Sequence, residues 1–126
     1  MAELSIFFNP SCSKCRTAQG LLAERGIDAD IVDYLLVPPT VPEVRVLMGQ
    51  LGITDPRLMM RTGEALYASL SLADQQGEGL LLAIAANPIL LERPIVVRDG
   101  RAVIARPPER LLELLTPITP LAPLTP

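Results

Sequence analysis

Two cysteines separated by two residues, Cys12 and Cys15, lie where an apolar strand is expected to turn into a helix. Residues 4–8 form a short apolar run that predicts a buried strand, and residues 14–25 carry apolar side chains at helical spacing. Cys12 then falls at the start of the helix, where backbone N–H groups lack intrahelical partners and the helix dipole favours anions. A thiol in that position is expected to ionise more easily than a free cysteine, so Cys12 is a candidate nucleophile.

Cys15 falls on the apolar face of the same predicted helix, with Ala18, Leu21 and Leu22. Two interpretations of Cys15 stay open at this point. It is either a small buried side chain of the core or a second redox-active thiol beside Cys12.

The composition restricts the chemistry available to these thiols. The chain has 126 residues, which suits one compact domain, and it contains two cysteines and no histidine. A Ser-His-Asp triad, a Cys-His dyad and a His-ligated metal are therefore excluded, and the ligands for a structural zinc site are too few. We expect no bound metal or cofactor, and we expect Cys12 to be activated by the helix terminus, backbone hydrogen bonds or nearby cations.

The charge and the hydropathy limit the partners. The net charge of −3 argues against non-specific binding to nucleic acid. No apolar run is long enough to span a bilayer, and no targeting segment is evident at the N-terminus. We expect a monomeric cytoplasmic protein that binds neither nucleic acid nor membrane.

The order of the predicted elements indicates the fold class. A second strand is expected within residues 27–34, with Ile31 and Val32 at its apolar centre and parallel to the first strand. The turn Asp99-Gly100 between two apolar runs predicts a β-hairpin, and residues 109–115 predict a last helix.

The middle of the chain predicts helices. Thr40 and Glu43 match a capping box at the start of one helix, and Gly52 is expected to end it. Further helical pieces are expected after Asp55-Pro56, over residues 64–70 and over residues 80–86, the last buried on nearly all sides. The whole order, β-α-β, helical insertion, β-hairpin and α, predicts an α/β fold with a thioredoxin-like mixed sheet.

The end of the chain has a different pattern. From residue 116 onward proline recurs at every third position, which excludes a helix or a central strand. We therefore expect one domain over residues 1–115 and a flexible, extended tail over residues 116–126.

Three arginines, Arg61, Arg93 and Arg106, each lie beside a predicted break in the chain. The planar guanidinium group binds tetrahedral oxyanions through two parallel hydrogen bonds, so three of them around a thiolate would form an oxyanion pocket. The alternative is that they are ordinary surface charges, with Arg93 paired to Glu92.

The chain resembles the glutaredoxin-coupled arsenate reductase family, a branch of the thioredoxin-like fold. The matching blocks keep the family's order and spacing over most of the chain. They are residues 9–16, Tyr34-Leu35 with Pro38-Pro39-Thr40, Leu58-Met59-Met60-Arg61, Asn87-Pro88-Ile89-Leu90, residues 92–97 and Arg106-Pro107-Pro108-Glu109.

The resemblance implies a set of site residues. Cys12 corresponds to the nucleophile and Arg61, Arg93 and Arg106 to the arginines around the oxyanion. Pro94 occupies the position of a cis proline that faces the active cysteine. We add Ser11 and Ser13 as substrate-binding residues and Asn9 as a structural residue of the site.

Two departures from the family pattern affect the predicted reaction. Well-studied members have no cysteine at the position of Cys15, and some have a histidine where this chain has Phe8. The resemblance implies reduction of arsenate to arsenite, with electrons from glutathione and glutaredoxin. Cys15 adds a second route, in which Cys15 resolves the reaction as a Cys12–Cys15 disulfide and thioredoxin serves in place of glutathione and glutaredoxin.

Two other functions stay open. One is a glutathione-dependent thiol–disulfide oxidoreductase without arsenate activity. The other is a redox-sensing regulator that binds RNA polymerase, because Spx-type regulators share the fold and use a similar cysteine pair as a switch. The chain has no basic extension, which counts against a regulator that binds RNA polymerase.

Overall fold

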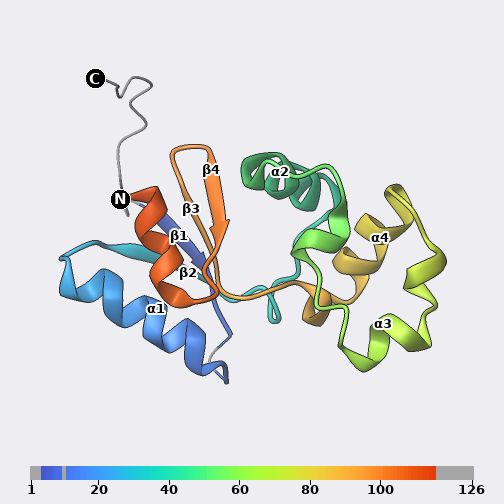
Figure 1. Cartoon of the computed structure of the whole chain (residues 1–126), viewed down its shortest axis with the longest axis horizontal. Coiled ribbons are helices and arrows are strands. Elements are labelled where there is room, and N and C mark those ends of the chain that lie inside the picture. The colour runs from blue at the N-terminus through green and yellow to red at the C-terminus, as the bar shows by residue number, and fades with distance from the viewer. Residues whose placement is uncertain (1–3, 10, 116–126) are drawn as a thin grey trace.

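The computed structural model describes residues 4–9 and 11–115 and is built on a four-stranded mixed sheet (Figure 1). The strands are β1 (Leu4–Phe7), β2 (Ala29–Val32), β3 (Ile95–Arg98) and β4 (Arg101–Ile104), in the order β2-β1-β3-β4. β1 pairs parallel with β2 and antiparallel with β3, and β3 pairs antiparallel with β4. The predicted thioredoxin-like mixed sheet is confirmed.

The helices follow the predicted order. The α-helices are α1 (Ser13–Glu24), α2 (Val41–Leu51), α3 (Ala65–Ser69) and α4 (Glu78–Ala86). Four short 3₁₀ helices complete the described chain: η1 (Pro56–Met59), η2 (Leu72–Asp74), η3 (Pro88–Leu90) and η4 (Pro108–Leu114).

The sheet separates two hydrophobic cores. On one face α1 and η4 pack on β1 and β3, with Ile6, Leu22, Val96 and Leu111 buried between them. On the other face α2 packs on β4 and α4 packs on α2, as Figure 1 shows to the right of the sheet. Because successive residues of a strand point to opposite faces, β1 and β3 contribute to both cores.

Two local predictions are confirmed in detail. The Thr40 hydroxyl accepts the N–H of Glu43 at 3.3 Å, while the Glu43 carboxylate accepts the N–H of Thr40 at 2.8 Å, which completes the capping box. In the hairpin, Asp99 and Gly100 have φ values of 52° and 79°. Both are left-handed, as the two central residues of a type I′ turn must be.

Several expectations differ from the structure. Ile31 is 44% exposed, because β2 is an edge strand and little covers that position. Residues 80–86 are not buried on nearly all sides: Leu82 is 54% exposed, because α4 packs through one face only and buries Leu80, Leu81 and Ile84. The predicted last helix is a 3₁₀ helix, η4.

Two sequence features fall outside the described residues, namely Pro10 and the proline-rich tail over residues 116–126. Within the described ranges, no helix combines the length and the apolar character needed to cross a bilayer.

Arg57 connects the short elements of the helical insertion. Its Nε donates to the Tyr67 hydroxyl at 2.9 Å, and its Nη2 donates to the carbonyl of Leu72 at 3.0 Å. The same nitrogen also donates to the carbonyls of Ala73 and Gln75. One guanidinium group therefore fastens the segment around η2 to η1.

We expect Arg57→Met to lower the free energy of unfolding by about 2 kcal/mol, because it leaves several carbonyls without their donor. Urea unfolding followed by circular dichroism measures the change. The control is Arg25→Met, which removes an exposed arginine and should change stability by less than about 0.5 kcal/mol. Equal effects of the two substitutions would show that the network contributes nothing specific.

Candidate active site

Asn9 shapes the turn that carries the two cysteines. Its side-chain Oδ1 accepts the N–H of Ser11 at 2.9 Å, and its carbonyl accepts the N–H of Cys12 at 2.9 Å. Its own N–H lies 3.5 Å from Sγ of Cys15. The predicted structural residue therefore folds the loop between β1 and α1 and touches the second cysteine.

Cys12 is the N-cap residue of α1, with an extended backbone (φ −97°, ψ 119°). Its carbonyl accepts the N–H of Arg16 at 3.2 Å, which begins the helix. The side chain is 7% exposed. The thiol thus lies almost buried at the end of a helix where N–H groups are free to bind an anion.

Several groups lower the pKa of Cys12. Burial opposes ionisation, but hydrogen bonds from the backbone and thiol of Cys15 and from the backbone of Lys14 act in the other direction. The positive charge of Arg93 acts with them, and the pKa falls below the ordinary value for a cysteine. Most of this stabilisation of the thiolate comes from its own helix terminus.

Cys15 has the opposite character. It is fully buried, and burial raises its pKa to about 11, assisted by its hydrogen bond to Cys12 and the charge of that thiolate. At neutral pH Cys15 is therefore protonated and donates its hydrogen bond to Cys12. Both thiols are free rather than joined in a disulfide.

Arg93 brings a cation to the pair. Its positive charge lowers the pKa of both Cys12 and Cys15. Nε and Nη1 of Arg93 are buried and have no hydrogen-bond partner in the described part of the chain. Leaving a buried charged donor unpaired is costly, so these two N–H groups are suited to bind an anion beside Cys12. The peptide between Arg93 and Pro94 is cis.

The other two arginines occupy different positions. Nη1 of Arg106 donates to the carbonyl of Arg93 at 3.0 Å, so Arg106 holds the main chain of Arg93. Arg61 forms an ion pair with Glu64 at 3.1 Å, and its side chain lies 3.5 Å from the carbonyl of Ile89. The positive charge of Arg61 acts to lower the pKa of the buried Tyr34, whereas the pKa shifts of the two cysteines come from other groups.

Tyr34 lies at the same end of the sheet as the cysteine turn, although sequence reasoning gave it no role. It is 1% exposed and packs against Phe7 with ring centroids 6.2 Å apart. Burial raises its pKa to about 12, and the charges of Arg93, Cys15, Arg61 and Cys12 also act on it. The sequence signal that could have identified Tyr34 is its position just after β2. Because β1 and β2 are parallel, a residue after β2 lies at the same edge of the sheet as the cysteine turn after β1.

Ser11 and Ser13 are both exposed beside Cys12. Ser13 is the first residue of α1, and Ser11 contributes its N–H to the Asn9 turn. The geometry therefore brings together Asn9, Cys12, Cys15 and Arg93, with Arg106 attached to Arg93. Among the described residues no group of acidic, cysteine or histidine side chains could hold a metal ion.

Comparisons with known proteins support one family. The model of the ArsC family matches residues 7–114. An arsenate reductase of Neisseria meningitidis is 45% identical over 117 residues, which cover 91% of this chain and all of that protein. An arsenate reductase of Haemophilus influenzae is 44% identical over 112 residues, or 87% of this chain and 97% of that protein.

A solved structure agrees in fold. The arsenate reductase from Vibrio cholerae superposes with a TM-score of 0.86 at 44% identity, over 89% of this chain and 97% of that chain. The match covers both the sheet that carries the cysteine turn and the helical insertion. The chain belongs to the ArsC family, which confirms the resemblance drawn from its sequence blocks.

Proposed function

We propose that the protein reduces arsenate to arsenite, with Cys12 as the nucleophile. The observation that carries the proposal is a thiol of lowered pKa beside a buried guanidinium group with two unpartnered N–H groups. Arsenate is a tetrahedral oxyanion, and its oxygens could accept both N–H groups of Arg93. The similarity to proteins named arsenate reductase supports this choice of anion.

In the first step the Cys12 thiolate attacks arsenic. A sulfur–arsenic bond forms, one arsenic–oxygen bond breaks, and the departing oxygen takes up protons and leaves as water. Arsenic stays pentavalent in this step. The positive end of the α1 helix dipole and the guanidinium group of Arg93 stabilise the charge on the remaining oxygens.

The attack changes the environment of Cys15. Once the Cys12 sulfur is bonded to arsenic its negative charge is gone, and that charge is one of the causes that raise the pKa of Cys15. The Cys15 proton can then pass to the departing oxygen. The result is a thiolate in the first turn of α1, three residues after the N-cap Cys12.

In the second step Cys15 acts as the resolving thiol. Its thiolate attacks the Cys12 sulfur, a disulfide forms, and the sulfur–arsenic bond breaks with its electron pair left on arsenic. Arsenic is reduced from the pentavalent to the trivalent state and leaves as arsenite, while two thiols are oxidised. A protein dithiol, thioredoxin or glutaredoxin, then reduces the disulfide. Glutathione with glutaredoxin could instead supply the resolving thiol.

A second candidate function is thiol–disulfide exchange without arsenate. The hydrogen-bonded, reduced Cys12–Cys15 pair favours it, because such a pair can accept or donate two electrons alone. The buried and unpartnered N–H groups of Arg93 have no role in that reaction.

The catalytic assignment is tested by arsenate-dependent NADPH oxidation, coupled to the thioredoxin system or to glutathione and glutaredoxin. We expect Cys12→Ser to be inactive with both systems. We expect the turnover rate of Cys15→Ser to fall about 100-fold or more, because an external thiol then has to release arsenite from Cys12 and does so slowly. Absence of turnover by folded, reduced wild-type protein with both systems would contradict arsenate reduction. Full activity of Cys15→Ser would assign resolution to an external thiol.

Arg93→Met separates the two candidate functions. We expect kcat/KM for arsenate to fall about 100-fold or more, the usual cost of removing one oxyanion donor. Reaction of Cys12 with an aromatic disulfide should fall less than about tenfold, since only one contribution to its pKa is lost. Arg45→Met, which removes an exposed arginine on α2, is the control. Equal losses in both reactions would contradict the oxyanion role.

A further inference from the structure

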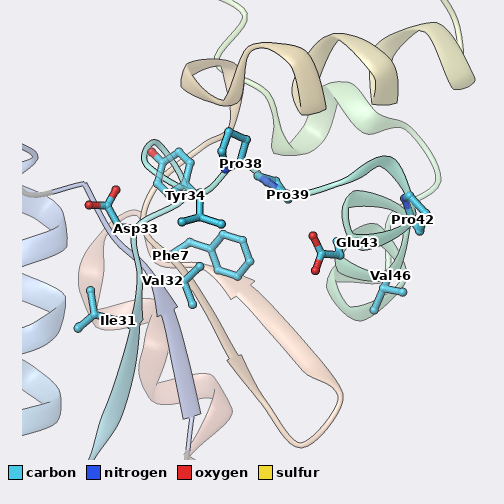
Figure 2. Close-up of a pocket in the computed structure, with 11 residues that line it drawn as sticks. Phe7, Ile31, Val32, Asp33, Tyr34, Pro38, Pro39, Pro42, Glu43 and Val46 are labelled. Atoms are coloured by element: carbon cyan, nitrogen blue, oxygen red, sulfur yellow. The ribbon is translucent and has the colours of Figure 1, made fainter.

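An apolar groove of about 760 Å³ opens between the ends of β1 and β2 and the helix α2 (Figure 2). Phe7, Val32 and Tyr34 line it on the sheet side, and Pro42 and Val46 line it from α2. The proline pair Pro38-Pro39 crosses between the two sides.

The groove exists because the insertion covers only part of the sheet. α2 packs on β4, at one edge of the sheet, whereas β2 forms the other edge. The face of β1 and β2 that carries Phe7 and Val32 is therefore left open. These two residues are register partners in the parallel pair, so the groove lies at the carboxyl ends of both strands.

The rim of the groove is unusually apolar for a surface. Val37 and Val46 are 70% and 59% exposed, and the neighbouring Leu36 is 76% exposed. A single exposed aliphatic side chain needs no explanation, but a contiguous group around a groove indicates a protein-binding surface.

The groove and the cysteines share one end of the sheet. The turn that holds Cys12 begins directly after β1, and Tyr34 is the second residue after the end of β2. Tyr34 lines the groove at this end of the sheet. A partner seated in the groove would therefore be next to the Cys12–Cys15 pair.

The charged residues of the groove indicate which class of reductant binds there. Of the described residues, its lining includes two carboxylates, Asp33 and Glu43, and no Lys or Arg. Both carboxylates also accept main-chain N–H groups, of Leu36 and Thr40 respectively. Glutathione is a small, polar, acidic peptide, so an apolar groove with acidic groups suits it poorly. A folded protein with an apolar surface around its thiol suits it well.

We propose that this groove is the docking surface for the protein dithiol that reduces the Cys12–Cys15 disulfide. The inference rests on the proposed function, in which that disulfide is formed. The partner's thiolate attacks one sulfur of the disulfide, so that a mixed disulfide forms and one cysteine of this chain leaves as a thiolate. The partner's second thiolate then breaks the mixed disulfide, which completes a two-electron transfer and leaves the partner oxidised.

The test follows exchange at Cys12 without arsenate. In a Cys15→Ser background, Cys12 is converted to its mixed disulfide with thionitrobenzoate. Release of the coloured thiolate is then measured with a reduced thioredoxin, a reduced glutaredoxin and dithiothreitol. The groove variant is Val37→Asp with Val46→Asp, and the control is Leu70→Asp with Leu82→Asp. The control changes exposed side chains outside the groove and adds the same charge.

We expect the groove variant to lower the second-order rate constant of the faster protein reductant about tenfold or more, with the dithiothreitol rate unchanged within about twofold. The control should retain both rates. The proposal would be overturned if the groove variant kept the wild-type rate constant with the protein reductant. It would also be overturned if the rate constant with dithiothreitol fell as much, or if the control variant lost as much as the groove variant. Because no step uses arsenate, failure of the proposed reductase activity would be recognised separately, in the NADPH assay.

Discussion

The site depends on the interaction between the Cys15 thiol and the Cys12 sulfur, which lowers the pKa of Cys12 and raises that of Cys15. It requires Cys12 at the N-cap of α1 and Cys15 one turn later on the buried face of the helix. The Asn9 turn fixes the first condition, and packing of α1 on the sheet fixes the second. One geometry thus gives the two thiols opposite tendencies: Cys12 ionises readily and Cys15 keeps its proton. A nucleophile and a proton-holding resolving thiol follow from the fold of a single helix terminus.

The arginines divide into distinct roles once their partners are known. Arg93 keeps two buried N–H groups available beside the thiols, whereas Arg61 is paired with Glu64. Arg106 binds the main chain of Arg93 and so maintains the position of that guanidinium group. Since a chain without histidine has few ways to stabilise a developing negative charge, the available donors of Arg93 and of the helix terminus carry that task.

Much of the fold was predictable because its signals are local. The Thr40–Glu43 capping box, the Asp99-Gly100 turn and the strand–helix–strand unit each depend on a few adjacent residues, and all were predicted. The exposure of Ile31 and Leu82 was not predictable, because the spacing of apolar residues does not show which edge of a sheet or which side of a helix stays uncovered.

The candidate site divides along the same line. Cys12 at a helix start is a local property and was predicted. The contacts of Arg61 with Ile89 and of Arg106 with Arg93 instead join residues 28 and 13 positions apart in the chain. Tyr34 was overlooked for that reason. Its place beside the cysteines depends on the parallel pairing of β1 and β2 rather than on any motif.

The central claim is that Cys15 holds the Cys12 thiolate by a hydrogen bond, and the pH titration of thiolate absorbance tests it most directly. In the wild type we expect Cys12 to titrate below the ordinary pKa of a cysteine, well separated from Cys15 at about 11. Cys15→Ala removes the thiol donor and should raise the pKa of Cys12, whereas Cys15→Ser retains a donor and should raise it less. An unchanged or lower pKa of Cys12 in Cys15→Ala would contradict the account.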